Sequence, residues 1–316
     1  MKPETIPEII LVEEMLPATE AALDSAFTVH RLAQAPDRPR FLAEVGPRIR
    51  AVVTGGGTGV QRTLFDALPN LEIIGINGVG TDAVDLEHAR SRGIRVTNTP
   101  DVLNDDVADI ALGLMLAVSR QLAAADRFVR SGAWAHGKFP LSRKMTGKRL
   151  GIFGLGRIGR AVAERATGFQ MEIAYTNRRP AENVPYRFEP SLEALARDSD
   201  ILVLAAAGGA STRALVNRAV IDALGPDGIL INVARGSVVD EPELVEALLE
   251  GRLGGAGLDV FTDEPNVPTA LFGLQNVVLI PHLGSATNET RAAMGELVVE
   301  NLAAHFAGRE LPTAVV

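Results

Sequence analysis

Three segments in the second half of the sequence carry side chains that together suit the reduction of a ketone. Each follows or ends a short apolar run: Arg235 lies in Asn232-Val-Ala-Arg-Gly-Ser, His282 lies in Ile280-Pro-His-Leu-Gly-Ser, and acidic residues lie in GLDVFTDEP, residues 257–265. An arginine binds a carboxylate through two parallel hydrogen bonds, and a protonated histidine gives a proton to an alkoxide as it forms. A carboxylate beside the imidazole orients the ring and favours its charged form. These residue types predict a site that reduces a 2-keto acid.

Spacing along the chain leaves the carboxylate partner of the histidine open, because Asp259, Asp263 and Glu264 all lie in the acidic segment. Of the five histidines, only His282 directly follows a predicted strand. A single histidine or arginine is more often structural, so the prediction depends on the three segments occurring together. The other histidines lie on predicted helix faces or in loops, and we interpret them as structural or solvent-exposed: His30, His88, His136 and His305.

The segment 148–165, KRLGIFGLGRIGRAVAER, places a short apolar run before a glycine-rich turn and an amphipathic helix after it. Gly154, Gly156 and Gly159 have the spacing G-x-G-x-x-G, which allows a tight turn, a close approach of a pyrophosphate, and close packing of helix and strand. Free N–H groups at the start of the helix bind the anion. The strand before and the helix after favour a dinucleotide site over a glycine turn without a ligand. The intervening residues belong to the same predicted site: Leu155, Arg157 and Ile158.

The end of the next predicted strand determines which dinucleotide is expected. An Asp or Glu about 20 residues after the glycines usually binds the ribose 2′-hydroxyl of NAD. Here the strand ends in Tyr175-Thr-Asn177-Arg178-Arg179, with no acid. Because a guanidinium binds phosphate strongly, Asn177, Arg178 and Arg179 favour NADP(H), while NAD(H) stays possible. The alternative is that both arginines are solvated loop residues.

The predicted elements place these segments at the ends of parallel strands. Short apolar runs alternate with amphipathic stretches, which is typical of βαβ units. In the first part we expect strands at 9–12, 51–53, 71–76 and 94–97, with helices at 18–27, 61–67 and 86–91. A long helix is expected from Val107 to about Phe128. Further strands are expected at 150–153, 172–175, 201–204, 229–233, 256–260 and 277–280, with helices at 242–249 and 289–306.

This pattern predicts an α/β protein with two parallel-sheet domains. The expected smaller domain, flavodoxin-like and substrate-binding, comprises residues 1–99 and 287–316, and the expected Rossmann dinucleotide-binding domain comprises residues 100–286. Ligands in such sheets bind at the carboxyl ends of the strands, where the catalytic segments lie. Two other glycine pairs, Gly57-Thr-Gly59 and Gly78-Val79-Gly80, lack the third glycine. We interpret both as strand-exit loops with exposed amides.

Composition limits the function classes further. The 316 residues carry a net charge of -8 and no cysteine, and Lys and Arg form no concentrated stretch. Nucleic acid is therefore an unexpected partner, and disulfides, thiol nucleophiles and cysteine-bound metals are excluded. We expect no metal site. No apolar run approaches the roughly 20 residues of a membrane span, and the N-terminus lacks the core of a signal peptide, so a cytoplasmic protein without membrane association is expected.

Five motifs in a fixed order resemble one known family. They are TNTPDVLNDDVADIALGLMLAVSR, GLGRIGRAVAER, NVARGSVVDEPELVEAL, GLDVFTDEP and NVVLIPHLGSAT. Together they resemble the D-2-hydroxyacid dehydrogenases, and within that family they are most similar to NADP-dependent glyoxylate/hydroxypyruvate reductases and hydroxyphenylpyruvate reductases. The resemblance begins near Ala51, and the first fifty residues match loosely. It implies hydride transfer from NADPH to a small 2-keto acid, giving a D-2-hydroxy acid.

The resemblance also implies roles for individual residues. Arg235, Glu264 and His282 match the catalytic set, which selects Glu264 as the partner of the histidine and makes His282 the proton donor. Arg235 and His282 also contact the substrate, whose carboxylate is expected at the amides of Val79 and Gly80. Asp259 matches an aspartate near the nicotinamide carboxamide. Further cofactor contacts are assigned to Val233, Ala234, Gly284 and Ser285.

The family further implies a homodimer formed through the segment after Pro100. The one tryptophan, Trp134, would then anchor the interface or lie near the partner's active site. Two alternatives remain. One is a different 2-hydroxyacid dehydrogenase, such as one for phosphoglycerate. The other is a dinucleotide-sensing scaffold, because corepressors share this fold and these catalytic residues.

Overall fold

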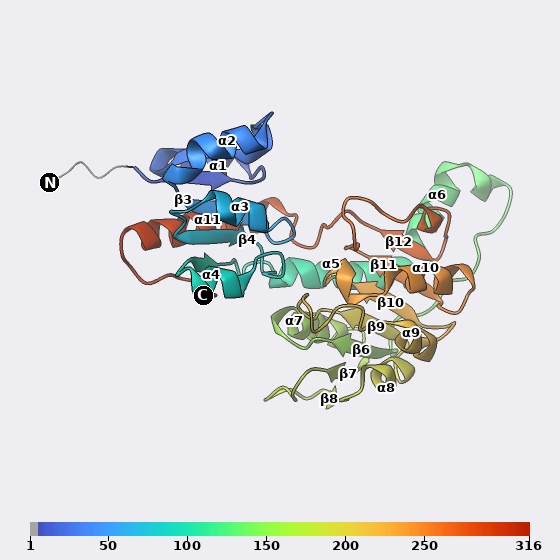
Figure 1. Cartoon of the computed structure of the whole chain (residues 1–316). Helices are drawn as coiled ribbons and strands as arrows, with labels where there is room; N and C mark the ends of the chain where they lie inside the picture. Colours follow the sequence, from blue (N-terminus) through green and yellow to red (C-terminus); the bar gives the residue numbers. More distant parts are fainter. Residues whose placement is uncertain (1–5) are drawn as a thin grey trace. The chain divides into compact units, whose positions relative to one another are not determined.

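The computed structural model describes residues 6–316, and the chain divides into two units (Figure 1). Unit 1 runs to Leu103 and resumes at Thr287–Val316, while unit 2 spans Asn104–Ala286. The first boundary thus lies after Leu103 rather than after residue 99. Thr290 Oγ1 donates to the carbonyl of Val102 at 3.4 Å, which ties this segment to the last helix.

Unit 1 is built on a parallel sheet with the order β2-β1-β3-β4-β5 within the described residues. The strands are β1 (Glu8–Leu11), β2 (Thr28–Arg31), β3 (Ile49–Gly55), β4 (Ile73–Asn77) and β5 (Arg95–Thr97). Alternate side chains point to opposite faces, so Ile9 packs with one helix layer and Ile10 with the other. One layer comprises α1 (Pro17–Ala26) and α11 (Asn288–Phe306). The other comprises α2 (Arg38–Val45), α3 (Arg62–Ala67) and α4 (Leu86–Ser91).

The strand β2 was not predicted, because none of its four residues is buried. It is an edge strand, and an edge strand lacks the continuous apolar run that marks a buried one. The chain end returns to the opposite edge of the same sheet. There Val315 N donates to the carbonyl of Val96 at 2.7 Å, and Arg95 Nε donates to the carbonyl of Val316 at 2.8 Å.

Unit 2 is built on a second parallel sheet, with the order β12-β11-β10-β9-β6-β7-β8 within the described residues. Its strands are β6 (Arg149–Phe153), β7 (Glu172–Thr176), β8 (Arg187–Phe188), β9 (Ile201–Leu204), β10 (Ile229–Asn232), β11 (Gly255–Leu258) and β12 (Val277–Leu279). The chain order reverses between the neighbours β6 and β9. In a doubly wound sheet this is the point where a dinucleotide binds. Both sheets confirm the predicted α/β fold with parallel strands.

Helices cover both faces of this sheet. On one face lie α8 (Leu192–Arg197), α9 (Arg218–Leu224) and α10 (Glu241–Leu249), which share a buried core with the strands. On the other lie α5 (Asn104–Ser119) and α7 (Arg157–Thr167). A Cβ at Gly257 would lie 3.0 Å from the Cβ of Leu114, so this glycine lets α5 approach the strand β11 closely.

The predicted helix from Val107 to Phe128 is wrong in one respect, because it consists of two helices. α5 ends at Ser119 and α6 (Leu122–Arg130) begins after a break bent by 61°. At the break Gln121 has φ +52°, a left-handed conformation that interrupts the helical hydrogen bonds. Neither glycine nor proline marks this position, so the apolar period gave no sign of it. No single helix among the described residues is long and apolar enough to cross a membrane, and only α5 and α6 together have that length and composition.

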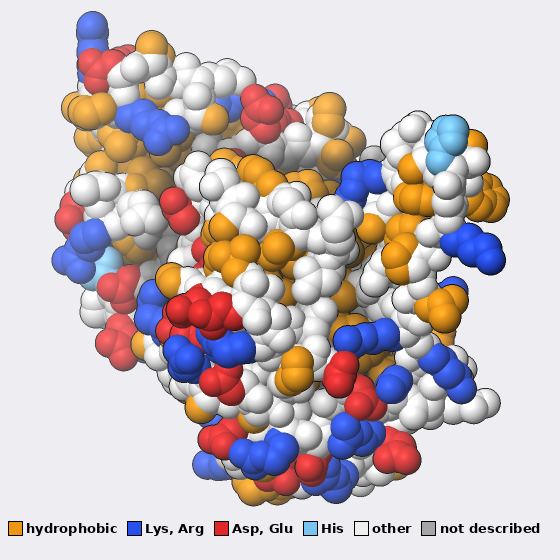
Figure 2. Space-filling model, turned by 90° about the vertical axis from the view of Figure 1, so that its right-hand side faces the viewer, with side chains coloured by type: hydrophobic (Ala, Val, Ile, Leu, Met, Phe, Trp, Pro, Cys, Tyr) orange, Lys and Arg blue, Asp and Glu red, His pale blue; other side chains and the backbone are white. Residues whose placement is uncertain are grey.

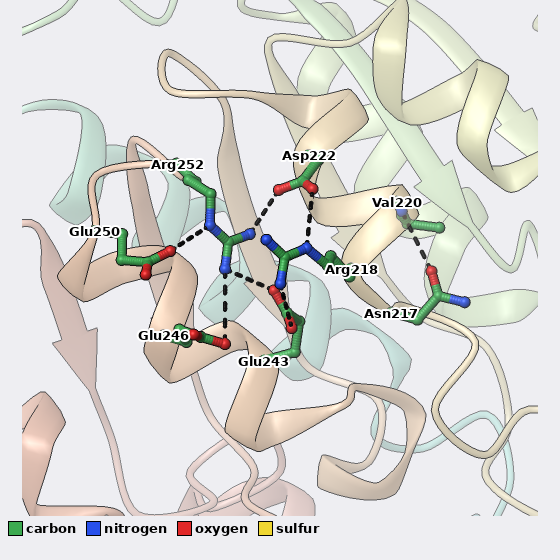
Figure 3. Close-up of polar contacts among 8 residues, drawn as sticks. All are labelled: Asn217, Arg218, Val220, Asp222, Glu243, Glu246, Glu250 and Arg252. Carbon is green, nitrogen blue, oxygen red and sulfur yellow. Dashed lines mark hydrogen bonds and ion pairs between the residues drawn. The ribbon is translucent and has the colours of Figure 1, made fainter.

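An ion network fixes the helices around the strand β10 (Figure 3). Arg252, in the turn after α10, pairs with Glu250, with Asp222 of α9 at 2.6 Å, and with Glu243 of α10 at 2.7 Å. Arg218 of α9 also pairs with Asp222 and Glu243. Glu243 therefore does more than complement the start of its helix. The network ties α9 and α10 to the turn that leads into β11.

Candidate active site

The imidazole of His282 and the carboxylate of Glu264 form a hydrogen-bonded pair in unit 2. Nδ1 of His282 lies 2.8 Å from Oε2 of Glu264, and Oε1 of Glu264 accepts the N–H of Phe261 at 2.9 Å. Both side chains are partly exposed. Within residues 6–316, Nε2 of His282 has no hydrogen-bond partner. The pair therefore leaves one ring nitrogen ready to exchange a proton with a bound molecule.

The surroundings of Glu264 keep its carboxylate ionised. Burial opposes the charge, but the hydrogen bonds from His282 and from the N–H of Phe261, together with the charges of His282 and Arg235, lower its pKa below the ordinary 4.5. The stabilisation from this lowered pKa is present above the ordinary value and is lost as the pH falls through the lower pKa of the folded state. At neutral pH the carboxylate is thus charged, and it lies beside Nδ1 of His282 as a hydrogen-bond acceptor.

Asp259, also in the acidic segment, holds the backbone of the histidine loop. Its side chain is 1% exposed, and its two oxygens accept the N–H of Leu283 at 2.5 Å and of Gly284 at 3.0 Å. Its carbonyl accepts the N–H of His282, whose φ is +52°. Burial raises the pKa of Asp259. The three acids thus have different partners: Asp263 bonds to Asn266, and Glu264 is the one that bonds to the imidazole.

Arg235 follows β10 in a turn held by Asn232, a residue to which sequence reasoning gave no role. Asn232 is buried, accepts the N–H of Ala234 at 3.0 Å and donates to the carbonyl of Arg235 at 3.0 Å. Nη1 of Arg235 donates to the carbonyl of Ala234 at 2.8 Å. The signal was an Asn at a strand end, where its side chain commonly closes a turn on its own backbone.

Gly236 and Glu241 join this turn to the segment that carries Glu264. A Cβ at Gly236 would overlap the carbonyl group of Phe261, so the two backbones are in direct contact. Oε1 of Glu241, at the start of α10, accepts the N–H of Thr262 at 2.9 Å. The sequence analysis gave Glu241 no role. Its bond to Thr262 could not be expected without knowing that the two segments meet.

The glycine motif lies between β6 and α7, next to the switch point. Gly154 has φ +99°, and a Cβ there would lie 2.5 Å from Cα of Ala206 after β9. A Cβ at Gly159 would overlap the carbonyl of Gly154, whereas Gly156 faces open space. In the described chain, the N–H groups of Gly156 and Ile158 have no acceptor. Open space and free donors at a helix N-terminus fit a pyrophosphate.

The end of β7 carries the residues expected to read the ribose. Oδ1 of Asn177 accepts the N–H of Leu155 at 2.7 Å, so Asn177 braces the glycine turn and keeps its amide NH₂ group for a ligand. Arg178 and Arg179 are exposed and form no ion pair with a described acidic residue. Their charges are therefore not neutralised by the protein, which fits a phosphate ligand.

The remaining predicted cofactor contacts differ in what they can offer. Val233 and Ala234 are buried, and their N–H groups donate to Leu204 and Asn232. The N–H of Gly284 is taken by Asp259, while Ser285 is half-buried. The buried residues thus present backbone rather than side chains to a ligand.

The substrate residues predicted in unit 1 lie in the loop after β4. The loop is fixed because Asn98 Nδ2 donates to the carbonyl of Val79 at 2.9 Å and the N–H of Thr99 donates to the carbonyl of Gly78 at 2.9 Å. The N–H groups of Val79 and Gly80 have no acceptor within residues 6–316. Such successive free amides bind anions. The loop at Gly57–Gly59 differs, since the N–H of Gly59 donates to the carbonyl of Gly55.

Comparison with known proteins identifies the family. Residues 112–284 match the family model described as D-isomer specific 2-hydroxyacid dehydrogenase, NAD binding domain. The chain is 54% identical to the hydroxyphenylpyruvate reductase of Plectranthus scutellarioides, and 50% identical to the glyoxylate/hydroxypyruvate reductase A of Arabidopsis thaliana, in each case over 98% of both chains. The chain belongs to the D-2-hydroxyacid dehydrogenase family.

Solved structures agree with this assignment. The 2-hydroxyacid dehydrogenase of Ketogulonicigenium vulgare matches with a TM-score of 0.91 and 51% identity, covering 99% of both chains. The NADPH-dependent glyoxylate/hydroxypyruvate reductase of Sinorhizobium meliloti, solved with NADP and malonate, matches with a TM-score of 0.91 and 43% identity, covering 99% of this chain and 97% of that one. The predicted family and the oxidoreductase class of this dehydrogenase are confirmed.

Proposed function

We propose that this dehydrogenase reduces a small 2-keto acid of the glyoxylate and hydroxypyruvate class to the D-2-hydroxy acid with NADPH. The observation that carries the proposal is the His282–Glu264 pair, which leaves Nε2 of the histidine free in the unit that also holds the glycine motif. Relatives named as reductases of glyoxylate, hydroxypyruvate and hydroxyphenylpyruvate support the substrate class.

Each residue has one task in this reaction. When bound, NADPH would supply the hydride that the carbonyl carbon receives. His282 gives the proton on Nε2 to the carbonyl oxygen, and Glu264 keeps the ring oriented and charged. Arg235 binds the substrate carboxylate and polarises the ketone, and the amides of Val79 and Gly80 bind the same carboxylate. Asp259, which holds the histidine loop, is assigned to the nicotinamide carboxamide.

The dinucleotide would be held by the second unit, and the first would bind substrate. Gly154, Gly156 and Gly159 with Ile158 receive the pyrophosphate, and Asn177, Arg178 and Arg179 receive the 2′-phosphate. Further contacts of this proposed site are the flanking residues Leu155, Arg157, Val233, Ala234, Gly284 and Ser285. NADH, which has no 2′-phosphate, is the weaker cofactor.

Replacing Arg178 by alanine should reduce the preference for NADPH over NADH by about 10- to 100-fold, since a hydrogen bond to a charged group contributes about 1.5–3 kcal/mol. The loss should appear in KM for NADPH and not in the kinetics with NADH. Added salt should weaken NADPH more than NADH, because the contact is exposed and screened. The exposed Arg309 of unit 1, replaced by alanine, is the control. Equal use of both cofactors by the unmodified enzyme would contradict Arg178 as a phosphate-binding residue.

Replacing Glu264 by glutamine should move the pH at which reduction falls off downwards, since it removes the negative charge beside the proposed proton donor. The measurement is the pH profile of kcat/KM for the keto acid. Asp263→Asn removes the same charge one residue away, at an exposed side chain that does not touch His282, and serves as control. An unchanged profile in the Glu264 variant would show that Glu264 only orients the ring.

We further propose a cytoplasmic homodimer formed through the segment after Pro100. Exposed hydrophobic side chains gather on the projecting segment 122–141 of unit 2, shown in orange in Figure 2. Trp134 is 68% exposed and Leu141 is 99% exposed. Several exposed large apolar side chains on one segment favour a protein interface there, with Trp134 as an anchor.

The reaction is tested by following the absorbance of NADPH with glyoxylate, hydroxypyruvate, pyruvate and hydroxyphenylpyruvate, ranked by kcat/KM. We expect turnover, with glyoxylate and hydroxypyruvate ranked first. Binding of NADPH without turnover of any keto acid would instead support a dinucleotide-sensing scaffold. Oxidation of phosphoglycerate in preference to glycerate would instead support a phosphoglycerate dehydrogenase.

A further inference from the structure

The carboxylate of Glu13 lies over a glycine at the carboxyl edge of the sheet in unit 1. Glu13 comes two residues after β1, where Val12 N still donates to the carbonyl of Val53 at 2.9 Å, so the pairing with β3 continues past the end of the strand. A Cβ at Gly55 would overlap Oε1 of Glu13 and lie 2.7 Å from its Cδ. The carboxylate therefore occupies the space that a side chain at position 55 would fill.

The side-chain amide of Asn77 lies on the other side of Gly55, on the neighbouring strand β4. Gly55 pairs in register with Asn77 of β4, and residues in register on neighbouring parallel strands point to the same face. Within residues 6–316, Oδ1 of Asn77 is buried without a hydrogen-bond partner. Such an oxygen requires a donor that the chain does not supply. Two residues later come the free amides of Val79 and Gly80.

The Glu13 carboxylate keeps an oxygen available. Oε2 accepts the hydroxyl of Thr58, while Oε1 has no hydrogen-bond partner among residues 6–316. No described arginine, lysine or histidine pairs with Glu13, so its charge is not compensated by a salt bridge. Glu14, the next residue, is exposed and equally acidic. The edge thus presents negative charge and hydrogen-bond acceptors beside an anion-binding loop.

The geometry points to a second recognition element for the substrate. Gly55 of β3 and Asn77 of β4 are paired in register, and Val79 and Gly80 follow shortly after Asn77, so the carboxylate over β3 and the free amides after β4 lie at the same edge of the sheet. We infer that Glu13 is a specificity-determining residue that reads the far end of the 2-keto acid whose carboxylate is bound at Val79 and Gly80. It accepts hydrogen bonds from hydroxyl groups and repels a second carboxylate. This inference rests on the proposed function.

In this role, Glu13 favours hydroxylated 2-keto monocarboxylates over 2-keto dicarboxylates as substrates. Hydroxypyruvate and longer polyhydroxylated acids present hydroxyl donors to Glu13. Oxaloacetate presents a second carboxylate to Glu13, and the repulsion between the two negative charges disfavours its binding. One relative, 46% identical over 98% of this chain, is named 2-ketogluconate reductase, from Gluconobacter oxydans. 2-Ketogluconate is a polyhydroxylated 2-keto monocarboxylate, the kind of substrate that Glu13 would favour. Glyoxylate has no atom beyond its aldehyde carbon and serves as the reference.

The test compares Glu13→Gln with the unmodified enzyme on hydroxypyruvate, 2-ketogluconate and oxaloacetate, each as kcat/KM relative to glyoxylate. Glutamine keeps an oxygen for Thr58, removes the charge and replaces the second acceptor oxygen by an NH₂ donor. The oxaloacetate ratio should rise about tenfold, because the repulsion is gone. The ratios for the two hydroxylated acids should fall about fivefold, since hydrogen bonds to a charged group are the stronger ones. Glu14→Gln removes the same charge at the neighbouring residue and should leave all ratios unchanged.

A second variant separates recognition from loop bracing. Thr58→Val removes the hydroxyl that binds Glu13 without changing any charge. If it reproduces the ratios of Glu13→Gln, or if Glu13→Gln leaves the ratios unchanged, Glu13 only braces the loop and the inference is overturned. If the unmodified protein reduces glyoxylate but the inference fails in this way, the proposed function stands. If no 2-keto acid is reduced, both fail.

Discussion

Replacing His282 by alanine should lower kcat for keto acid reduction by roughly 100- to 10,000-fold, the usual contribution of a positioned acid or base. The imidazole is hydrogen-bonded through Nδ1 to Glu264, and within the described residues no group forms a hydrogen bond with Nε2. Removing the ring removes the proposed proton donor, whereas Glu264→Gln leaves it in place. The histidine variant should therefore lose more activity than the glutamine variant. The measurement is kcat with saturating NADPH and keto acid.

Binding of NADPH provides the check that the His282 variant is folded, since His282 is not among the residues assigned to the dinucleotide. His30→Ala is the matched control, because His30 lies on the edge strand β2 of unit 1 and has no role in the proposed reaction. A kcat near normal in the His282 variant would make the assignment wrong. An equal loss in both histidine variants would point to a general effect on the protein.

The arrangement of strands was accessible from the sequence because both sheets are parallel and buried. The predicted strand 150–153 overlaps β6, which is buried except for Arg149, and the predicted strand 201–204 matches the fully buried β9, since a continuous apolar run marks a strand covered on both faces. Thr28–Arg31 and Arg187–Phe188 form edge strands without a buried residue, and neither was predicted. The bend at Gln121 was missed for another reason, because its residues give no local signal.

The residues that carry the chemistry of the candidate site were predictable from the sequence, whereas the residues that hold them in position were not. Arg235, Glu264 and His282 carry the functional types, and their motifs could be recognised. Asn232 closes the turn after its own strand at 3.0 Å, whereas Glu241 binds the backbone of another segment, the N–H of Thr262, at 2.9 Å. Such bonds depend on which loops meet in space. From residues alone Asp259, Asp263 and Glu264 were equivalent, and only the fold sends one to the imidazole and another to the backbone.

Replacing Arg235 by lysine should reduce kcat/KM for a small keto acid by roughly 100-fold, within the cost of leaving a charged partner without its hydrogen bond. Lysine keeps the charge but loses the planar fork that meets a carboxylate at two points. The turn should survive, because Asn232 holds it through the carbonyl of residue 235 and not through the guanidinium.

The loss in the Arg235 variant should divide between a higher KM for the keto acid and a lower kcat, because the guanidinium is proposed both to bind the carboxylate and to polarise the ketone. The affinity for NADPH should change little and is measured on the same preparation. The pH profile should keep its shape if Glu264 and His282 are undisturbed. An unchanged kcat/KM would show that Arg235 serves the turn alone, whereas an equal loss of NADPH affinity would place its effect on the fold of unit 2.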